Sequence, residues 1–257
     1  MTMQARAVST RNALIRSAAQ TFDQHGFAHA KLSGISSGAG VSPGALYFHF
    51  DTKAAVAAAV EEEADRTLRG LARHVRRKSP SALQALIDIS HVYAQHIRWD
   101  VVVRAGLHLN SEAPHALDIN LRERWFTCVH ELLARAVADQ TAFPDAAHDD
   151  ATATIVAATV GVESLGRQNP DWLSRESLAG LWRHLLPGLA RPEAFERLEL
   201  VGTESVINTT GGVLGPRAGL ARSVPRARKT QPGSPAHATG GTTRNLRVGP
   251  GTTCPLD

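Results

Sequence analysis

Residues 32–53 read LSGISSGAGVSPGALYFHFDTK, and this stretch decides the fold of the first part of the chain. Gly40 permits a sharp turn between two short helical segments. Ser42 and Pro43 then supply an N-cap and a proline at the first helical position, so a new helix is expected to begin there. Two short helices joined by a tight turn are typical of a helix-turn-helix.

The side chains of this stretch divide into an inner and an outer set. The residues expected to face a core are Ile35, Ala39, Val41, Leu46 and Phe50. Small residues at positions 43–45 would let the second helix approach base edges, while Tyr47 and Lys53 are the leading candidates for phosphate contacts. Ser33 is expected to cap the first of the two helices. The candidate DNA-binding residues are Ser33, Ser42, Pro43, Gly44, Ala45, Tyr47, His49 and Lys53.

The rest of the chain is also expected to be helical, because apolar residues recur at helical spacing from about residue 10 to residue 190 and β-branched alternation is almost absent. A first helix over residues 10–25 would end at Gly26. The fold class is therefore all-α, with a three-helix helix-turn-helix domain followed by a larger helical domain. Further helices are expected over residues 53–77, 81–98, 100–112, 117–140, 146–167 and 174–189.

Composition divides the chain into three parts, which are a DNA-binding domain (1–52), a helical effector and dimerisation domain (53–202) and a disordered basic tail (203–257). The tail is rich in Gly, Pro, Ser, Thr and Arg and has no sustained period. The chain has a net charge of +4, of which the tail carries +5 and the first 202 residues −1. Overall basicity therefore says little about the folded part, and the interpretation rests on the helix-turn-helix pattern.

The sequence contains no secretory signal, and its longest apolar runs (54–60 and 155–162) are far shorter than a membrane span of ~20 residues. We expect a soluble, cytoplasmic protein with no membrane partner. Two cysteines, Cys128 and Cys254, are too few for a disulfide framework or a CxxC metal site, which is typical of a reducing compartment.

Enzyme signatures are incomplete wherever they begin. His130-Glu131 starts like a zincin motif, but position 134 is alanine. Glu112 and His115 have di-iron spacing, but Pro114 lies between them and would break the helix. We expect no enzymatic activity, no metal site and no cofactor.

The residues from Thr10 to Lys53 resemble the DNA-binding domain of the TetR family of repressors. The resemblance rests on Phe22, Gly26, Gly40-Val41-Ser42, Leu46-Tyr47-Phe48-His49-Phe50 and Lys53. It implies a homodimer built on the last two helices of the second domain, double-stranded operator DNA as partner, and release of that DNA when a small effector binds.

A second, narrower resemblance is to the γ-butyrolactone receptors of actinomycetes, which control antibiotic production. It rests on residues 101–109, which read VVVRAGLHL, with Glu112, Trp125 and Leu132-Leu133. The resemblance implies that Trp125 lies in an effector pocket for a lactone or a related butenolide or furan. The candidate effector residues are Trp125, Val102, Leu107, Val129, Thr159 and Glu163.

Competing interpretations of these residues stay open at the level of sequence. Trp125, Val129 and Leu132 have the spacing of an ordinary core face, and Gly161 and Gly166 fit either close approach of a partner helix or a local bend. The leading hypothesis is a dimeric repressor with one recognition helix per half-site of a pseudo-palindromic operator. The alternatives are a multidrug-type TetR repressor with a cationic or aromatic effector, and an all-α enzyme or ligand carrier that does not bind DNA.

Overall fold

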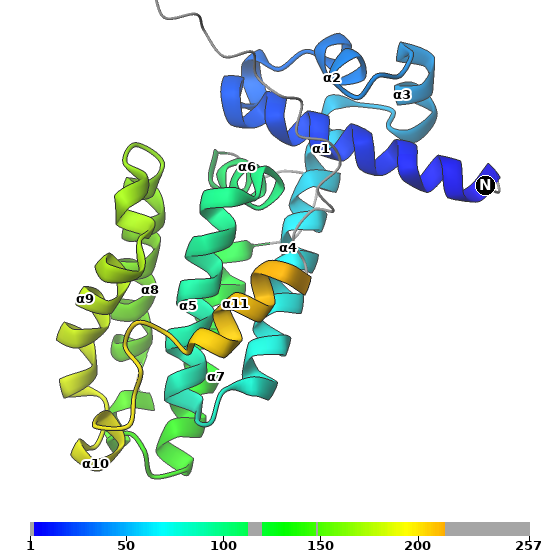
Figure 1. The fold of residues 1–257 in the computed structure, drawn as a ribbon. Coiled ribbons are helices and arrows are strands. Elements are labelled where there is room, and N and C mark those ends of the chain that lie inside the picture. Colours follow the sequence, from blue (N-terminus) through cyan, green and yellow to red (C-terminus); the bar gives the residue numbers. More distant parts are fainter. Residues whose placement is uncertain (1–2, 113–119, 148, 214–257) are drawn as a thin grey trace, which may run out of the picture. The chain divides into compact units, whose positions relative to one another are not determined.

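The computed structural model describes residues 3–112, 120–147 and 149–213. Within these residues the regular structure is helical, and the pairing of Ala142 with Ala190 is an isolated bridge outside any strand. The all-α prediction is therefore confirmed (Figure 1).

The helices follow the predicted order, and α4 to α9 begin and end within a few residues of the predicted bounds, whereas α10 and α11 were not predicted. They are α1 (Met3–His29), α2 (Leu32–Gly38), α3 (Pro43–His49), α4 (Lys53–Lys78), α5 (Ala82–Trp99), α6 (Val101–Glu112), α7 (Leu121–Ala138), α8 (Asp149–Gly166), α9 (Arg175–Leu185), α10 (Pro192–Phe195) and α11 (Glu204–Val213). Short 3-10 turns η1 (Pro144–Ala147), η2 (Pro170–Leu173) and η3 (Leu186–Gly188) lie between them.

Two details of the first helices differ from the prediction. α1 begins seven residues before Thr10, and Gly26 is a break inside it, with φ 69° and ψ 169°, rather than its end. The prediction that Ser33 caps α2 is wrong, because the helix begins one residue earlier than Ser33 and its N-cap is Lys31. Ser33 therefore lies in the first turn of α2, where its carbonyl oxygen accepts a hydrogen bond from the Ser36 hydroxyl at 3.0 Å.

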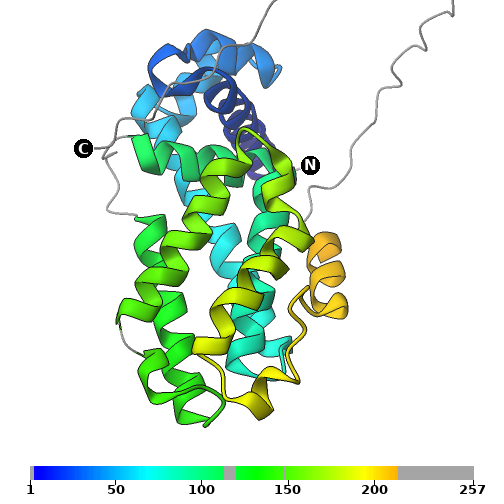
Figure 2. The ribbon, with the colours of Figure 1, turned by 90° about the vertical axis from the view of Figure 1, so that its left-hand side faces the viewer.

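Apolar side chains form two separate cores. The first core holds residues of α1, α2, α3, α4 and α6, including Phe22, Leu46 and Leu109, while the second joins α4 and α5 to α7, α8 and α9 around Trp182. α6 crosses α4 closely at Gly106, where a β-carbon would lie 2.4 Å from that of Ala64. α4 contributes to both cores, and its long ribbon can be followed from one to the other in Figures 1 and 2.

The end of the described chain is fastened to α5 by a segment that we call the C-terminal strap, residues 199–203. The carboxylate of Asp88, which is fully buried, accepts hydrogen bonds from the Ser79 hydroxyl (2.6 Å), the Gln84 amide (2.9 Å) and the Thr203 backbone N–H (2.8 Å). His91 donates from Nε2 to the carbonyl oxygen of Leu200 at 2.9 Å. Gln84 also accepts the backbone N–H of Glu199 at 2.8 Å, so three buried polar side chains of α5 (Gln84, Asp88 and His91) hold the strap in place.

α11 follows the strap and packs on α5 and α4 (Figure 1). Val206 and Ile207 are each 4% exposed, so the predicted start of a disordered tail at residue 203 is wrong for the stretch up to residue 213. The remainder of that predicted tail, residues 214–257, lies outside the described residues.

Candidate DNA interface and effector pocket

α3 has one buried face and one exposed face, as the helix-turn-helix pattern predicts. Leu46 and Phe50 are 1% and 5% exposed and pack into the first core. Tyr47 is 56% exposed. The hydroxyl oxygen of Ser42 accepts the backbone N–H of Ala45 at 3.2 Å, so the predicted N-cap is confirmed. The helix thereby exposes Tyr47 and the small residues of its first turn to solvent.

The other candidate residues of this face are also accessible. Ser33, Pro43 and Gly44 are exposed, and Ala45 and His49 are half-buried. Phe48 is a residue that the sequence analysis missed, since it is 81% exposed. A helical wheel could have found it, because Phe48 lies two residues from both Leu46 and Phe50 and therefore about 200° around the helix from the buried face.

Lys53 does not lie free on the surface, so the prediction that it points outward is wrong. Its ammonium donates to the backbone carbonyl oxygens of Phe27 (2.8 Å), Ala28 (3.0 Å) and Ala30 (3.2 Å), at the end of α1. It also lies 4.6 Å from the centre of the Phe27 ring, a cation–π distance. A lysine has three N–H donors, and all three find acceptors here. Lys53 thus fastens the start of α4 to the C-terminal end of α1.

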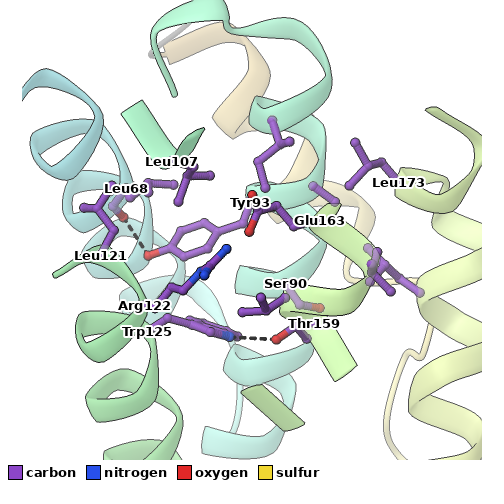
Figure 3. A pocket seen from close by; sticks show the side chains of 15 residues that line it. Leu68, Ser90, Tyr93, Leu107, Leu121, Arg122, Trp125, Thr159, Glu163 and Leu173 are labelled. Carbon is purple, nitrogen blue, oxygen red and sulfur yellow. Dashed lines mark hydrogen bonds between the residues drawn. The ribbon is translucent and has the colours of Figure 1, made fainter. Parts of the chain in front are cut away.

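The second core contains a cavity of about 70 Å³ between α4, α5, α6, α7, α8 and α9. Four of the six predicted effector residues line it, namely Trp125, Leu107, Thr159 and Glu163. Its walls are mostly apolar and include Leu68, Leu121 and Leu173 (Figure 3). An apolar wall with a few polar groups is typical of a small-molecule pocket.

Three polar side chains of this pocket, those of Trp125, Thr159 and Tyr93, are already paired with each other or with the backbone. The indole N–H of Trp125 donates to the Thr159 hydroxyl at 2.8 Å, and that hydroxyl shares its one proton between the carbonyl oxygens of Ile155 (2.8 Å) and Val156 (3.1 Å). Tyr93, which the sequence analysis missed, lies with its ring 5.3 Å from that of Trp125 and donates from its hydroxyl to the Leu68 carbonyl oxygen at 3.0 Å. Figure 3 shows these side chains converging on the cavity.

Glu163 is the acidic group of the pocket. Burial raises the pKa of its carboxyl, and the nearby guanidinium groups of Arg122 and Arg167 lower that pKa in part. Arg122 also lines the cavity. The lining of the pocket therefore contains one acidic and one basic side chain, Glu163 and Arg122, whose formal charges are opposite.

Two of the predicted effector residues, Val102 and Val129, do not line the cavity. Val102 belongs to the first core, because α6 turns this face toward the core it shares with α1 and α4. Val129 is fully buried in the second core, and its spacing from Trp125 reflects packing.

A wider groove lies on the other side of Trp125. It has a volume of about 490 Å³, lies between α4 and α7, and shares Leu68, Tyr93, Leu121 and Trp125 with the inner cavity. Thr127 lines this groove and not the cavity. We call this space the α4–α7 groove; Trp125 is part of the wall between it and the inner cavity.

No helix within the described residues is long and apolar enough to cross a membrane. The same residues hold no cluster of three or more His, Cys, Asp or Glu side chains that could bind a metal ion. Cys128 is a free, half-buried thiol whose pKa is raised to about 11 by burial. Cys254 lies outside the described residues.

The fold and the two sites together define a helix-turn-helix regulator with a ligand pocket in its second core. The profile of the tetR family of bacterial regulatory proteins matches residues 14–60. Over 203 residues the chain is 30% identical to the A-factor receptor protein of Streptomyces griseus, and the alignment covers 79% of this chain and 71% of the relative. The chain therefore belongs to the tetR family of bacterial regulatory proteins.

Solved structures place it near one group within that family. A crystal structure of a γ-butyrolactone receptor, an ArpA-like protein, matches with 30% identity and a TM-score of 0.66, covering 80% of this chain and 98% of the receptor. CprB from Streptomyces coelicolor, solved in complex with its biological operator sequence, matches with 30% identity and a TM-score of 0.64, covering 80% and 97%. The chain is thus a tetR-family regulator similar to γ-butyrolactone receptors, as the sequence resemblance predicted.

Proposed function

We propose that the chain is a homodimeric transcriptional repressor that acts in the bacterial cytoplasm. It binds a pseudo-palindromic operator and is released by a γ-butyrolactone or a related butenolide or furan, and its target genes serve antibiotic biosynthesis. The observation that carries the proposal is the pairing, within one chain, of an exposed α3 face with an apolar pocket lined by Trp125. The proposed role includes no enzymatic step.

In this proposal α3 is the recognition helix, and residues 1–52 form the DNA-binding domain. Pro43, Gly44 and Ala45 have side chains small enough to let the helix approach base edges. Tyr47, His49, Ser33 and Ser42 bind phosphates, and Phe48 adds an apolar contact of the kind that thymine methyl groups accept. Lys53 acts indirectly, by holding α4 against α1.

The proposed dimer interface is formed by α8 and α9, the last two long helices of the described chain. α8 consists largely of Ala, Val, Ile and Thr, yet only Thr152, Ile155 and Gly166 of its residues are fully buried. Leu165 is 45% exposed, and a β-carbon on Gly161 would meet open space. An apolar helix whose residues are mostly half-buried or exposed fits a symmetric contact with a second copy. Gly166, by contrast, lies close to the side chain of Leu173 in the same chain, so its lack of a side chain serves packing within the chain.

The effector is proposed to enter beside Trp125 and enlarge the inner cavity. A cavity of about 70 Å³ is far below the ~300–1,000 Å³ of typical ligand pockets, so an effector of ordinary size has to enlarge it. The effector binds more tightly to an opened state that is incompetent for DNA binding, which shifts the equilibrium away from the operator. Trp125 and Thr159 would exchange their mutual hydrogen bond for bonds to the effector.

A multidrug-type pocket for a cation is the second candidate, and Glu163 is the observation that favours it. The carboxyl, however, has a raised pKa and lies near Arg122 and Arg167, which oppose a cationic ligand. The Trp125-lined, largely apolar pocket favours a neutral oxygen-containing effector.

The test is a gel-shift titration on DNA from upstream of the chain's own gene. Wild-type protein should give a sequence-specific shift that synthetic alkyl γ-butyrolactones dissolve. Tyr47→Ala should weaken operator binding about tenfold. The matched control is Phe143→Ala, at an aromatic residue that is 37% exposed and lies between α7 and η1, and it should leave operator binding unchanged. A specific shift that no lactone dissolves would refute the effector class, and no shift on any upstream sequence would refute the repressor function.

A further inference from the structure

Two buried acids of α4 face the start of α7. Glu61 and Asp65 are 1% and 3% exposed and lie four residues apart, so they occupy one face of the helix. Acids are seldom fully buried unless they are paired. Each of these two carboxylates is held by a group that belongs to α7 or is bonded to its first residue.

Asp65 is held by two guanidinium groups. Nη2 of Arg69, on the same helix, lies 2.8 Å from Oδ2, and Nε of Arg124, on α7, lies 3.0 Å from Oδ1. Oδ1 accepts no aligned hydrogen bond, so the contact with Arg124 is an ion pair that depends on proximity. A displacement of α7 relative to α4 changes the distance between Asp65 and Arg124, whereas Arg69 moves with α4.

Glu61 reaches α7 through one intermediate residue. The Asn110 amide donates from Nδ2 to Oε1 of Glu61 at 3.0 Å. The same amide accepts, at Oδ1, the backbone N–H of Leu121 at 2.9 Å. Leu121 is the first residue of α7. The acids thus hold both the first turn of α7 and the end of α6.

These contacts lie between the effector pocket and the DNA-binding domain. Leu121 and Trp125, the neighbours of Arg124 on α7, line both the inner cavity and the α4–α7 groove. α4 begins at Lys53, which binds the end of α1, and it contributes to the core beneath α3. α4 therefore links the residues that contact α7 to the core beneath α3.

We propose that Glu61 and Asp65, with Asn110, Leu121 and Arg124, form a seam that transmits effector binding to the DNA-binding domain. The seam is closed when the pocket is small and opens when an effector parts α7 from α4. Asp65 and Arg124 are its positioning residues: they hold α4 in the orientation that suits the operator. The inference rests on the proposed function and adds the residues that couple its two sites.

The physical basis is the difference between the two states. A ligand shifts a conformational equilibrium only as far as its affinities for the two states differ. An effector that enlarges a cavity of about 70 Å³ must displace Trp125 or its neighbours, and Arg124 precedes Trp125 directly. Loss of the Asp65–Arg124 pair then leaves Arg69 as the ion-pair partner of Asp65, and the ion pair between α4 and α7 at this position is lost.

The experiment compares Asp65→Asn, Arg124→Gln and the double variant in the full chain. Operator affinity is measured by fluorescence anisotropy with a labelled upstream duplex, with and without a synthetic alkyl γ-butyrolactone. The matched control is Arg76→Gln, which removes the exposed Arg76–Glu131 pair (2.7 Å) between the same two helices. Arg124→Lys keeps the positive charge and serves as the conservative rescue. Thermal melting shows that each variant is folded, and Arg124→Gln, whose side chain is 47% exposed, carries the test if Asp65→Asn does not fold.

Each single variant should weaken effector-free operator binding about tenfold, within the range of allosteric couplings. The double variant should lose no more than either single one, Arg124→Lys should restore most of the affinity, and Arg76→Gln should behave as wild type. Adding the lactone should lower operator affinity by a smaller factor in the seam variants than in wild type. If folded Arg124→Gln binds the operator as tightly as wild type and is released by the lactone to the same extent, the seam proposal is refuted and the repressor function still stands. Failure of the wild-type protein to bind any operator would overturn both.

Discussion

Lys53→Met is the substitution that best separates a structural lysine from a DNA-contacting one. Methionine keeps most of the length of the side chain and removes the ammonium that bonds to three carbonyl oxygens at the end of α1. Lys31→Met is the matched control, because Lys31 is an exposed lysine of the same domain whose side chain forms no capping bond with α2.

The expected loss of stability follows from these bonds. A hydrogen bond to a charged group contributes about 1.5–3 kcal/mol, but Lys53 is half-buried and water competes for its ammonium. We therefore expect a total loss of about 1–2 kcal/mol rather than the sum of three full bonds. For a unit of this size that corresponds to a fall in Tm of about 2–8 °C. Lys31→Met should leave Tm unchanged.

Two measurements test this reasoning, namely thermal melting by circular dichroism and the salt dependence of operator affinity. A lysine that binds a phosphate contributes about 0.9 to the slope of log K against log salt concentration, and its loss reduces that slope. A structural Lys53 instead lowers the affinity at every salt concentration and leaves the slope as in wild type. An unchanged Tm together with a slope reduced by about two per dimer would refute the structural role.

Three further substitutions test other parts of the structure. Gly106→Ala should destabilise the protein by about 1–3 kcal/mol, because a β-carbon there meets Ala64 at 2.4 Å. The control Gly70→Ala, on α4 where a β-carbon meets open space, should stabilise it by about 0.5–1 kcal/mol. Equal effects of the two substitutions on the free energy of unfolding in urea would contradict the close crossing of α6 and α4. Trp125→Phe should cost about 1 kcal/mol through loss of the bond to Thr159 and should weaken lactone binding in calorimetric titration, and wild-type lactone affinity would argue against an effector role for the indole. Burial lowers the pKa of His91 from its ordinary value of 6.5, so the unfolded state takes up a proton first and the unfolding free energy falls as the pH drops below about 6.5. His91→Gln keeps a donor for Leu200 and should flatten that part of the pH profile, and an unaltered profile would show that another group causes it.

The fold could be predicted from the sequence because its signals are local. The Ser42-Pro43 pair and Gly40 mark the turn, and the spacing of Leu46 and Phe50 marks the buried face of α3. α11 was missed for the same reason. Its sequence, ESVINTTGGV, is poor in helix-forming residues, and its place depends on the packing of Val206 and Ile207 on α5 and α4.

The sites could be predicted only in part, because side-chain partners distant in sequence decide them. Lys53 appears free on a helical wheel, and its acceptors lie 23 to 26 residues earlier in the chain. Val102 and Leu107 lie on the same short helix, and tertiary packing sends the first to one core and the second to the pocket. Tyr93 gave no signal, since an aromatic residue in an apolar helix fits any core.

The C-terminal strap has a consequence for synthesis on the ribosome. The first core is complete once Leu109 has been made, whereas the second core also needs Val206 and Ile207, which pack on α5 and α4 only after the strap has reached Asp88 and His91. At about 5–20 residues per second, the 98 residues between Leu109 and Ile207 take roughly 5–20 s to translate. During that interval the nascent chain holds a complete first core beside an incomplete second core, so the DNA-binding half of each copy is formed before the pocket and before the α8 and α9 surface of the proposed dimer.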